Sequence, residues 1–173
     1  MKKQFYFPKN VFFFLSVLFF TTAATNSGAT NFEQALNNPN RSAEEKARDA
    51  ERKPAATLNF FGLQSDMAVI ELMPGKGWYT KILGNILKGN GTHYVAIMPN
   101  RVADKLENWG LQNTKVIAEK AELIPTEVKY VFDLKNLNFD INAVDMVLTF
   151  RNVHNLSPSA RATLNQKTVS YTH

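Results

Sequence analysis

The residues with the clearest chemical purpose form a short turn in the stretch "VIELMPGKGWYT", residues 69–80. An apolar run that carries Glu71 breaks at Pro74 and continues through Gly75 and Gly77. Glycine accepts a positive φ angle and has no Cβ, so a ligand can approach the backbone closely. A helix that begins directly afterwards points free N–H groups at the same place, which favours a carboxylate or phosphate. The turn predicts either a ligand site or a tight strand-to-helix connection.

The carboxylate within the preceding apolar run favours the ligand. Glu71 stands between Ile70 and Leu72, inside a run that reads as a buried strand. A buried carboxylate is costly unless it is paired or hydrogen-bonded. We therefore expect Glu71 to accept hydrogen bonds from backbone amides or to face an amine of a ligand.

Titratable residues also occur beside two apolar runs further along the chain. Asp133 follows the run at 128–132, and Asp145 lies at the start of the run at 143–150. His154 comes shortly afterwards and is a weak candidate for a general base that works near neutral pH. A polar cap on a loop is the simpler interpretation of His154.

Strands and helices must position these residues, and the sequence contains recognisable patterns for both. The apolar runs predict strands at 67–73, 93–98, 128–132 and 143–150. Capping signals and helical spacing predict helices at 43–53, 54–63, 79–87 and 100–111. The segment 113–125 is ambiguous between strand and helix. This alternation predicts an α/β fold with a Rossmann-like parallel sheet and flanking helices, in which ligands bind beyond the carboxyl ends of the strands.

The first 29 residues have the pattern of a signal peptide. Three lysines precede the apolar run "VFFFLSVLFF", and small residues follow it. A run of about ten apolar residues is too short to span a bilayer, which needs about twenty. We expect cleavage after Ala24 or Ala29 and export to the periplasm or the medium, with a retained anchor as the alternative. Residues 30–41 are polar and Asn-rich, which predicts a flexible lead-in.

Charge and composition exclude several classes of function. The leader holds three of the twenty basic residues and none of the fifteen acidic ones, so the net charge falls from +5 to +2 after cleavage. After cleavage, the remaining chain has no basic cluster of the kind typical of nucleic-acid binding. The chain has no cysteine, and its three histidines are far apart in sequence, so we expect no metal site. Arg48, Asp49 and Arg52 either line a site entrance or form a solvated helix face.

Three blocks of sequence, taken in order, resemble a known family. They are "RDAERKP", "VIELMPGKGWYT" and "LTFRNVHN", together with an acidic residue after the predicted third strand. The set resembles the class I S-adenosylmethionine-dependent methyltransferases. More narrowly, it resembles a branch of predicted exported methyltransferases that carry signal peptides. The resemblance covers residues 42–156, from Ser42 to about Asn155, and implies the first four strands of that fold.

The resemblance implies a role for S-adenosylmethionine as cofactor and assigns residues to it. The glycine turn would lie under the methionine part, Asp133 would meet the adenine, and the residues after the fourth strand would meet the sulfonium and the substrate. Asn100 stands near the position where the family usually has an acid that grips the ribose. The implied cofactor-binding residues are Glu71, Pro74, Gly75, Gly77, Asn100, Asp133, Phe150, Arg151 and Asn152.

Two other functions compete with methyl transfer to an unknown acceptor. One is a non-catalytic exported α/β module that binds a small ligand or a protein partner through the same crevice. The other is a nicotinamide-dependent oxidoreductase, but its fingerprint G-x-G-x-x-G would need glycine where Thr80 stands. Retention of the adenosyl cofactor on purification distinguishes a methyltransferase from a binding module.

The resemblance ends near Leu156, and the remaining residues 157–173 show no apolar periodicity. We expect this segment to be an unstructured tail or a tail foreign to the family. The fourth predicted strand would then be an edge strand with unpaired N–H and C=O groups. This pattern is typical of a truncated reading frame, from which weak or absent methyl transfer is expected.

Overall fold

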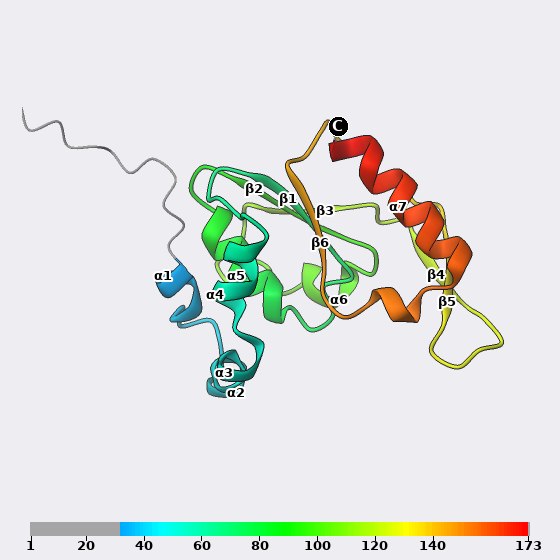
Figure 1. Cartoon of the computed structure of the whole chain (residues 1–173). Coiled ribbons are helices and arrows are strands. Elements are labelled where there is room, and N and C mark those ends of the chain that lie inside the picture. Colours follow the sequence, from blue (N-terminus) through cyan, green and yellow to red (C-terminus); the bar gives the residue numbers. More distant parts are fainter. Residues whose placement is uncertain (1–31, 173) are drawn as a thin grey trace, which may run out of the picture.

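The computed structural model describes residues 32–172, so the predicted signal peptide lies outside the described residues. Four short helices come first: α1 (Phe32–Leu36), α2 (Ala43–Ala47), α3 (Asp49–Arg52) and α4 (Pro54–Phe60) (Figure 1). The predicted capping box begins α2, where the Ser42 hydroxyl accepts from the Glu45 N–H and the Glu45 carboxylate accepts from the Ser42 N–H. The lead-in that was predicted to be flexible includes α1. This helix packs against the rest of the fold through the buried Ala35.

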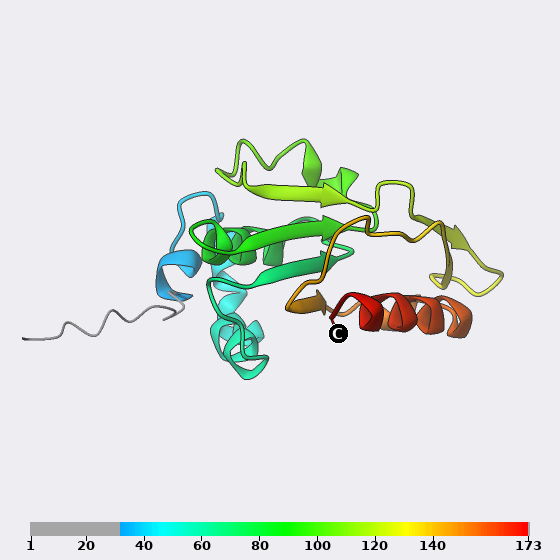
Figure 2. The ribbon, with the colours of Figure 1, turned by 90° about the horizontal axis from the view of Figure 1, so that it is seen from above.

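Four parallel strands form the central sheet in the order β3-β2-β1-β6. They are β1 (Ala68–Leu72), β2 (Thr92–Ala96), β3 (Thr114–Ile117) and β6 (Met146–Thr149), and they lie side by side in Figure 2. Helix α5 (Trp78–Leu87) connects β1 to β2, and the short helix α6 (Asn100–Ala103) follows β2. The predicted Rossmann-like α/β fold is confirmed.

The third strand of the sheet is not the one predicted at 128–132. The ambiguous segment forms β3 and then β4 (Glu122–Pro125), which pairs antiparallel with β5 (Phe132–Lys135) in a separate hairpin. Most of the run 128–132 is the hairpin's turn, in which Thr126 exchanges hydrogen bonds with Val128 and Val131. The turn leaves Val128 exposed, so apolar character alone was misleading here.

Alternate residues of β1 face two separate apolar cores, as the two-residue period of a strand requires. Val69 packs with Ile82 and Leu83 of α5 on one face. Ile70 and Leu72 pack on the other face, among residues of the β4–β5 hairpin and the C-terminal segment. Glu71 shares the α5 face with Val69, and it pairs in register with Val95 of β2 and Leu148 of β6. Its carboxylate is thus carried into the interior.

The C-terminal segment, predicted to lack structure, forms the 15-residue helix α7 (Pro158–Thr172), drawn in red in Figure 1. Its N-terminus is capped by the Ser157 hydroxyl, which accepts from the Ala160 N–H. Ala160 and Leu164 are buried against the core that includes Ile70. The sequence did not predict this helix because few of its residues face the core. So few buried apolar residues produce no visible helical periodicity.

The packing of α7 predicts a loss of stability when its main anchor is shortened. Leu164 is 4% exposed, so Leu164→Ala should lower the free energy of unfolding by about 2–3 kcal/mol through lost burial and a cavity. Val169 on the same helix is 54% exposed, and Val169→Ala should change stability by less than about 0.5 kcal/mol. Urea denaturation measures both, and equal midpoints would contradict a docked α7.

Strand β6 lies at one edge of the sheet within the part of the chain that the structure describes. Its only strand partner there is β1, so its outer backbone groups have no partner strand, as the sequence predicted for the fourth strand. Among residues 32–172, no helix has the length and apolar character needed to cross a membrane.

Candidate functional site

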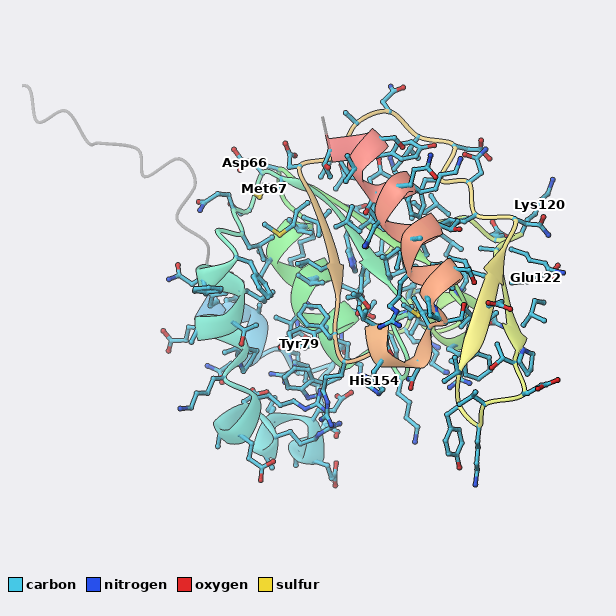
Figure 3. The ribbon with its side chains drawn as sticks, turned by 45° about the vertical axis from the view of Figure 1, so that its right-hand side comes forward. Asp66, Met67, Tyr79, Lys120, Glu122 and His154 are labelled. Carbon is cyan, nitrogen blue, oxygen red and sulfur yellow. The ribbon has the colours of Figure 1, made fainter. Side chains whose placement is uncertain are left out.

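The carboxyl ends of the sheet strands meet at one end of the molecule, where backbone strain is concentrated. Residues with positive φ that are not glycine follow all four strands: Met73 after β1, Ile97 and Met98 after β2, Ala118 after β3 and Arg151 after β6. Such conformations cost free energy and cluster at ligand-binding sites. Figure 3 shows Tyr79 toward this end and Asp66, which precedes β1, toward the opposite one.

The two glycines of the turn serve different purposes. Gly75 has φ +61°, and a Cβ placed there would meet nothing within 4 Å. Gly77 has φ +84° and precedes α5, but its Cβ would lie 2.5 Å from the Trp109 ring and 3.2 Å from Val102. Gly75 therefore leaves open space at the site, whereas Gly77 permits close packing beneath it.

Two adjoining cavities open around the turn. The first, which we call the apolar cavity, has a volume of about 340 Å³. It is lined by Met73, Gly75, Met98, Arg101, Leu123, Phe132, Asn152, Asn155 and Leu156. Two of these residues are linked, because the Asn152 side chain donates a hydrogen bond to the Met73 carbonyl at 3.2 Å.

The second cavity, which we call the arginine cavity, has a volume of about 260 Å³. It is lined by Arg48, Arg52, Glu71, Met73, Pro74, Gly75, Lys76, Trp78, Tyr79, Phe150 and Asn152. Met73, Gly75 and Asn152 line both cavities, so the two form one crevice that crosses the glycine turn. The predicted ligand site beyond the strand ends therefore has a physical counterpart.

Glu71 is the buried acid of this crevice. The side chain is 2% exposed, and its Oε2 atom is fully buried without a hydrogen-bond partner. Instead of backbone amides, the imidazole of His93 is its neighbour, with Nε2 at 3.5 Å from Glu71 Oε2. Because Glu71 also lines the arginine cavity, it can still face an amine of a ligand.

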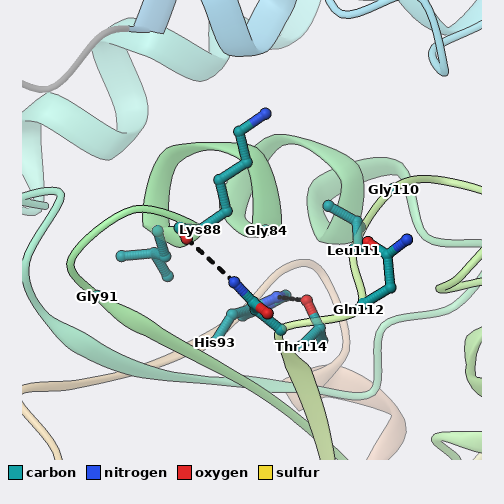
Figure 4. A pocket seen from close by; sticks show the side chains of 10 residues that line it. Gly84, Lys88, Gly91, His93, Gly110, Leu111, Gln112 and Thr114 are labelled. Carbon is teal, nitrogen blue, oxygen red and sulfur yellow. Dashed lines mark hydrogen bonds between the residues drawn. The ribbon is translucent and has the colours of Figure 1, made fainter.

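His93 is the residue of this region that the sequence did not single out. It is also 2% exposed, and its Nδ1 lies 3.1 Å from the Thr114 hydroxyl of β3. Figure 4 shows this contact at a third cavity, of about 190 Å³, near the amino ends of β2 and β3. The register between β1 and β2 places His93 opposite Val69, and Val69 and Glu71 point to the same face of the sheet. Knowledge of this register would have revealed the pair of Glu71 and His93.

Of the residues after β6, Phe150 and Asn152 line the crevice. The Phe150 ring stacks on Tyr79 with a centroid distance of 3.4 Å and an interplanar angle of 10°. Burial raises the pKa of the Tyr79 phenol, so it stays protonated near neutral pH. Arg151 is exposed at φ +62°, outside the lining of both cavities.

His154 lies in the 3-10 helix η1 (Val153–Asn155), exposed and outside the lining of both cavities (Figure 3). The geometry therefore favours the simpler interpretation, a polar residue on a loop. Among residues 32–172, no group of three or more acidic or histidine side chains is placed to hold a metal ion.

Asp133 is not where the sequence placed it. It lies within β5 rather than after a strand of the central sheet, and it accepts hydrogen bonds from Ser157 and from Ser159. These hydroxyls, Ser157 first, lower the pKa of Asp133. The carboxylate thus ties the hairpin to the start of α7 and lines neither cavity. The sheet strand β3 is instead followed by Ala118 and Glu119, beside an open hollow of about 950 Å³.

Asn100 also lies outside both cavities. It begins α6 with an exposed side chain, whereas Met98, two residues earlier, lines the apolar cavity. The positive φ angles at Ile97 and Met98 turn the chain between β2 and α6, which the sequence pattern did not reveal.

The segment before β1 covers the mouth of the arginine cavity. Arg48 and Arg52 line it, while Asp49 pairs with Arg41 at 2.6 Å. Trp78 also lines this cavity, and its indole N–H donates to the Glu45 carbonyl at 2.9 Å, which links α5 to this segment. Two of the three charged residues that the sequence left undecided therefore line the entrance.

Comparison with known proteins gives one structural likeness. No protein-family model and no curated protein matches the sequence. The fold is similar to that of a solved structure described as a SAM-dependent methyltransferase from Aquifex aeolicus. The sequence identity is 24%, the TM-score is 0.51, and the match covers 71% of this chain. It covers 61% of that chain, so this protein spans about three fifths of its neighbour's length. The likeness shows the fold alone, in agreement with the α/β arrangement described above.

Proposed function

We propose that this protein binds S-adenosylmethionine in the crevice and transfers its methyl group to an acceptor. The observation that carries the proposal is the crevice itself, which crosses a glycine turn and is lined by the buried carboxylate of Glu71. The structural likeness and the sequence resemblance support the same activity.

The residues present fit such a cofactor. Glu71 would hold the amine of its methionine part, because it lines the arginine cavity and a buried carboxylate is stabilised by a positive partner. Gly75 leaves room for the cofactor against the backbone. The apolar cavity, with Met98, Leu123 and Phe132, would take the adenosine part without an acid for the ribose.

The cofactor supplies a methyl group already activated by its sulfonium, so the protein has to align the acceptor and exclude water. Asn152 borders both cavities and is placed to position the two ligands. Tyr79 remains a neutral hydrogen-bond donor near neutral pH because burial raises its pKa. With His154 outside the crevice, no general base is proposed.

A non-catalytic module that binds a ligand in the same crevice is the competing proposal. Mass spectrometry of small molecules released from the purified protein distinguishes the two when combined with a transfer assay that uses labelled cofactor. We expect retained S-adenosylmethionine or S-adenosylhomocysteine and weak transfer, because β6 is an edge strand within residues 32–172 and leaves that flank of the sheet without a further strand. Retained ligand of another class would favour the module.

We also propose that the protein is exported, as its first 29 residues suggest. Expression in a bacterium with an active secretion pathway should yield a mature N-terminus between residues 24 and 31. N-terminal sequencing by mass spectrometry measures it. An intact Met1 on exported protein would contradict this proposal.

A further inference from the structure

The arginine cavity has an excess of positive charge that no ion pair within residues 32–172 neutralises. Arg48, Arg52 and Lys76 line it, and Glu71 is its only acid. None of the three cations lies within ion-pair distance of an acidic side chain in the described part of the chain. By contrast, nearby Lys81 is paired with Glu45 at 2.8 Å.

The two arginines lie over the same ring, and Arg52 is partly withdrawn from water whereas Arg48 is exposed. Arg52 is half-buried, with its guanidinium 4.9 Å from the centre of the Trp78 ring, and Arg48 lies 5.9 Å from the same centre. Partial burial, followed by the charges of Arg48 and Arg151, lowers the pKa of Arg52. Like charges held together in this way favour an anion between them.

The cofactor proposed above does not account for this charge. S-adenosylmethionine has an ammonium, a carboxylate and a sulfonium, so it carries a net positive charge. Its single carboxylate would neutralise one of the cations, while its sulfonium and ammonium add to the excess. A crevice that is already positive at one side therefore favours a second, anionic ligand when the cofactor is bound.

We propose that Arg48 and Arg52 bind a carboxylate or phosphate group of the methyl acceptor, so that the acceptor is an anionic molecule. This inference rests on the proposed methyl transfer. Lys76 lines the same cavity and the charge of Arg151 acts on Arg52, so both add to the attraction for an anion. Arginine suits the role because its planar donors fit both groups in a bidentate manner.

Phosphate and phenyl phosphate are the probes, added at constant ionic strength to the mature protein. Because Trp78 lies beneath both arginines, anion binding should change the tryptophan fluorescence. Arg52→Gln should lower the affinity for either anion about tenfold, through loss of a charge-assisted contact. The matched control is Arg161→Gln, which removes an exposed arginine of α7 and should leave the response unchanged.

Calorimetry with S-adenosylhomocysteine separates this inference from the proposed function. We expect its affinity to change by less than about twofold in Arg52→Gln, because the arginines hold the acceptor. An equal loss of affinity for phosphate and for S-adenosylhomocysteine would overturn the inference, since the arginines would then hold the cofactor's carboxylate. So would wild-type protein that shows no response to either anion. An Arg52-dependent anion response without S-adenosylhomocysteine binding would support the anion site and contradict the cofactor.

Discussion

Gly75→Val should abolish binding of the adenosyl cofactor and leave the fold intact. Gly75 lines both cavities, and the space beside it is open, so a valine side chain would occupy the volume in which the ligand meets the backbone. The φ angle of +61° should cost about 1–2 kcal/mol of stability. Affinity for S-adenosylhomocysteine, measured by calorimetry, should fall at least about a hundredfold, as expected when a ligand is displaced from its site.

Gly62→Val is a matched control for this variant. Gly62 has φ +75° and open space around it, but it lies outside the lining of both cavities. It should show a similar loss of stability with unchanged affinity. Unchanged affinity in Gly75→Val itself would show that the turn is only a connection.

Gly77→Val tests the opposite role for the second glycine of the turn. A Cβ 2.5 Å from the Trp109 ring, together with φ +84°, should cost about 3 kcal/mol or more of stability. Both glycines were predicted to bind the cofactor, but the structure separates a ligand-facing position, Gly75, from a packed one, Gly77. A Gly77→Val protein as stable as the wild type would contradict this assignment.

The second large effect is expected at Glu71, where binding and stability should change in opposite directions. Glu71→Leu removes the carboxylate proposed to hold the cofactor amine, and affinity should fall by about 1.5–3 kcal/mol, or roughly 10- to 150-fold. The same change replaces a buried charged group whose Oε2 has no hydrogen-bond partner. Because this charge has no hydrogen bond to offset its burial, removing it should stabilise the fold, here by about 1 kcal/mol.

Glu71→Gln, which keeps the shape of the side chain, is the companion variant. It should bind the cofactor nearly as weakly as Glu71→Leu, because an amide cannot pair with an ammonium as a carboxylate does. Urea denaturation and calorimetry together provide the measurement. Strong destabilisation with unchanged affinity would mean that Glu71 is a structural partner of His93, 3.5 Å away.

Local patterns were sufficient for the parts of the fold that depend on neighbouring residues. The apolar runs around β1, β2 and β6 and the cap at Ser42 were predicted, since burial and capping leave short-range signals. The run 128–132 was misread because the bonds of Thr126 turn the chain there. Helix α7 was missed because few of its side chains face the core.

In the candidate site, too, the residues with a local sequence signal were predicted and those that depend on long-range contacts were not. Glu71 and Gly75 were found because strand and turn are adjacent in sequence, and both line the crevice. The approach of His93 to Glu71 depends on the register between β1 and β2, which no local pattern specifies. The position of Arg52 over Trp78 depends on how α3 packs against α5, a contact between segments far apart in sequence.

The most direct test of the central claim is a calorimetric titration of the mature wild-type protein with S-adenosylhomocysteine. If the crevice holds the cofactor, the titration should show one binding site per chain, which is lost in Gly75→Val and retained in Gly62→Val. No measurable heat of binding from the folded wild-type protein, at concentrations that reach the millimolar range, would contradict the account.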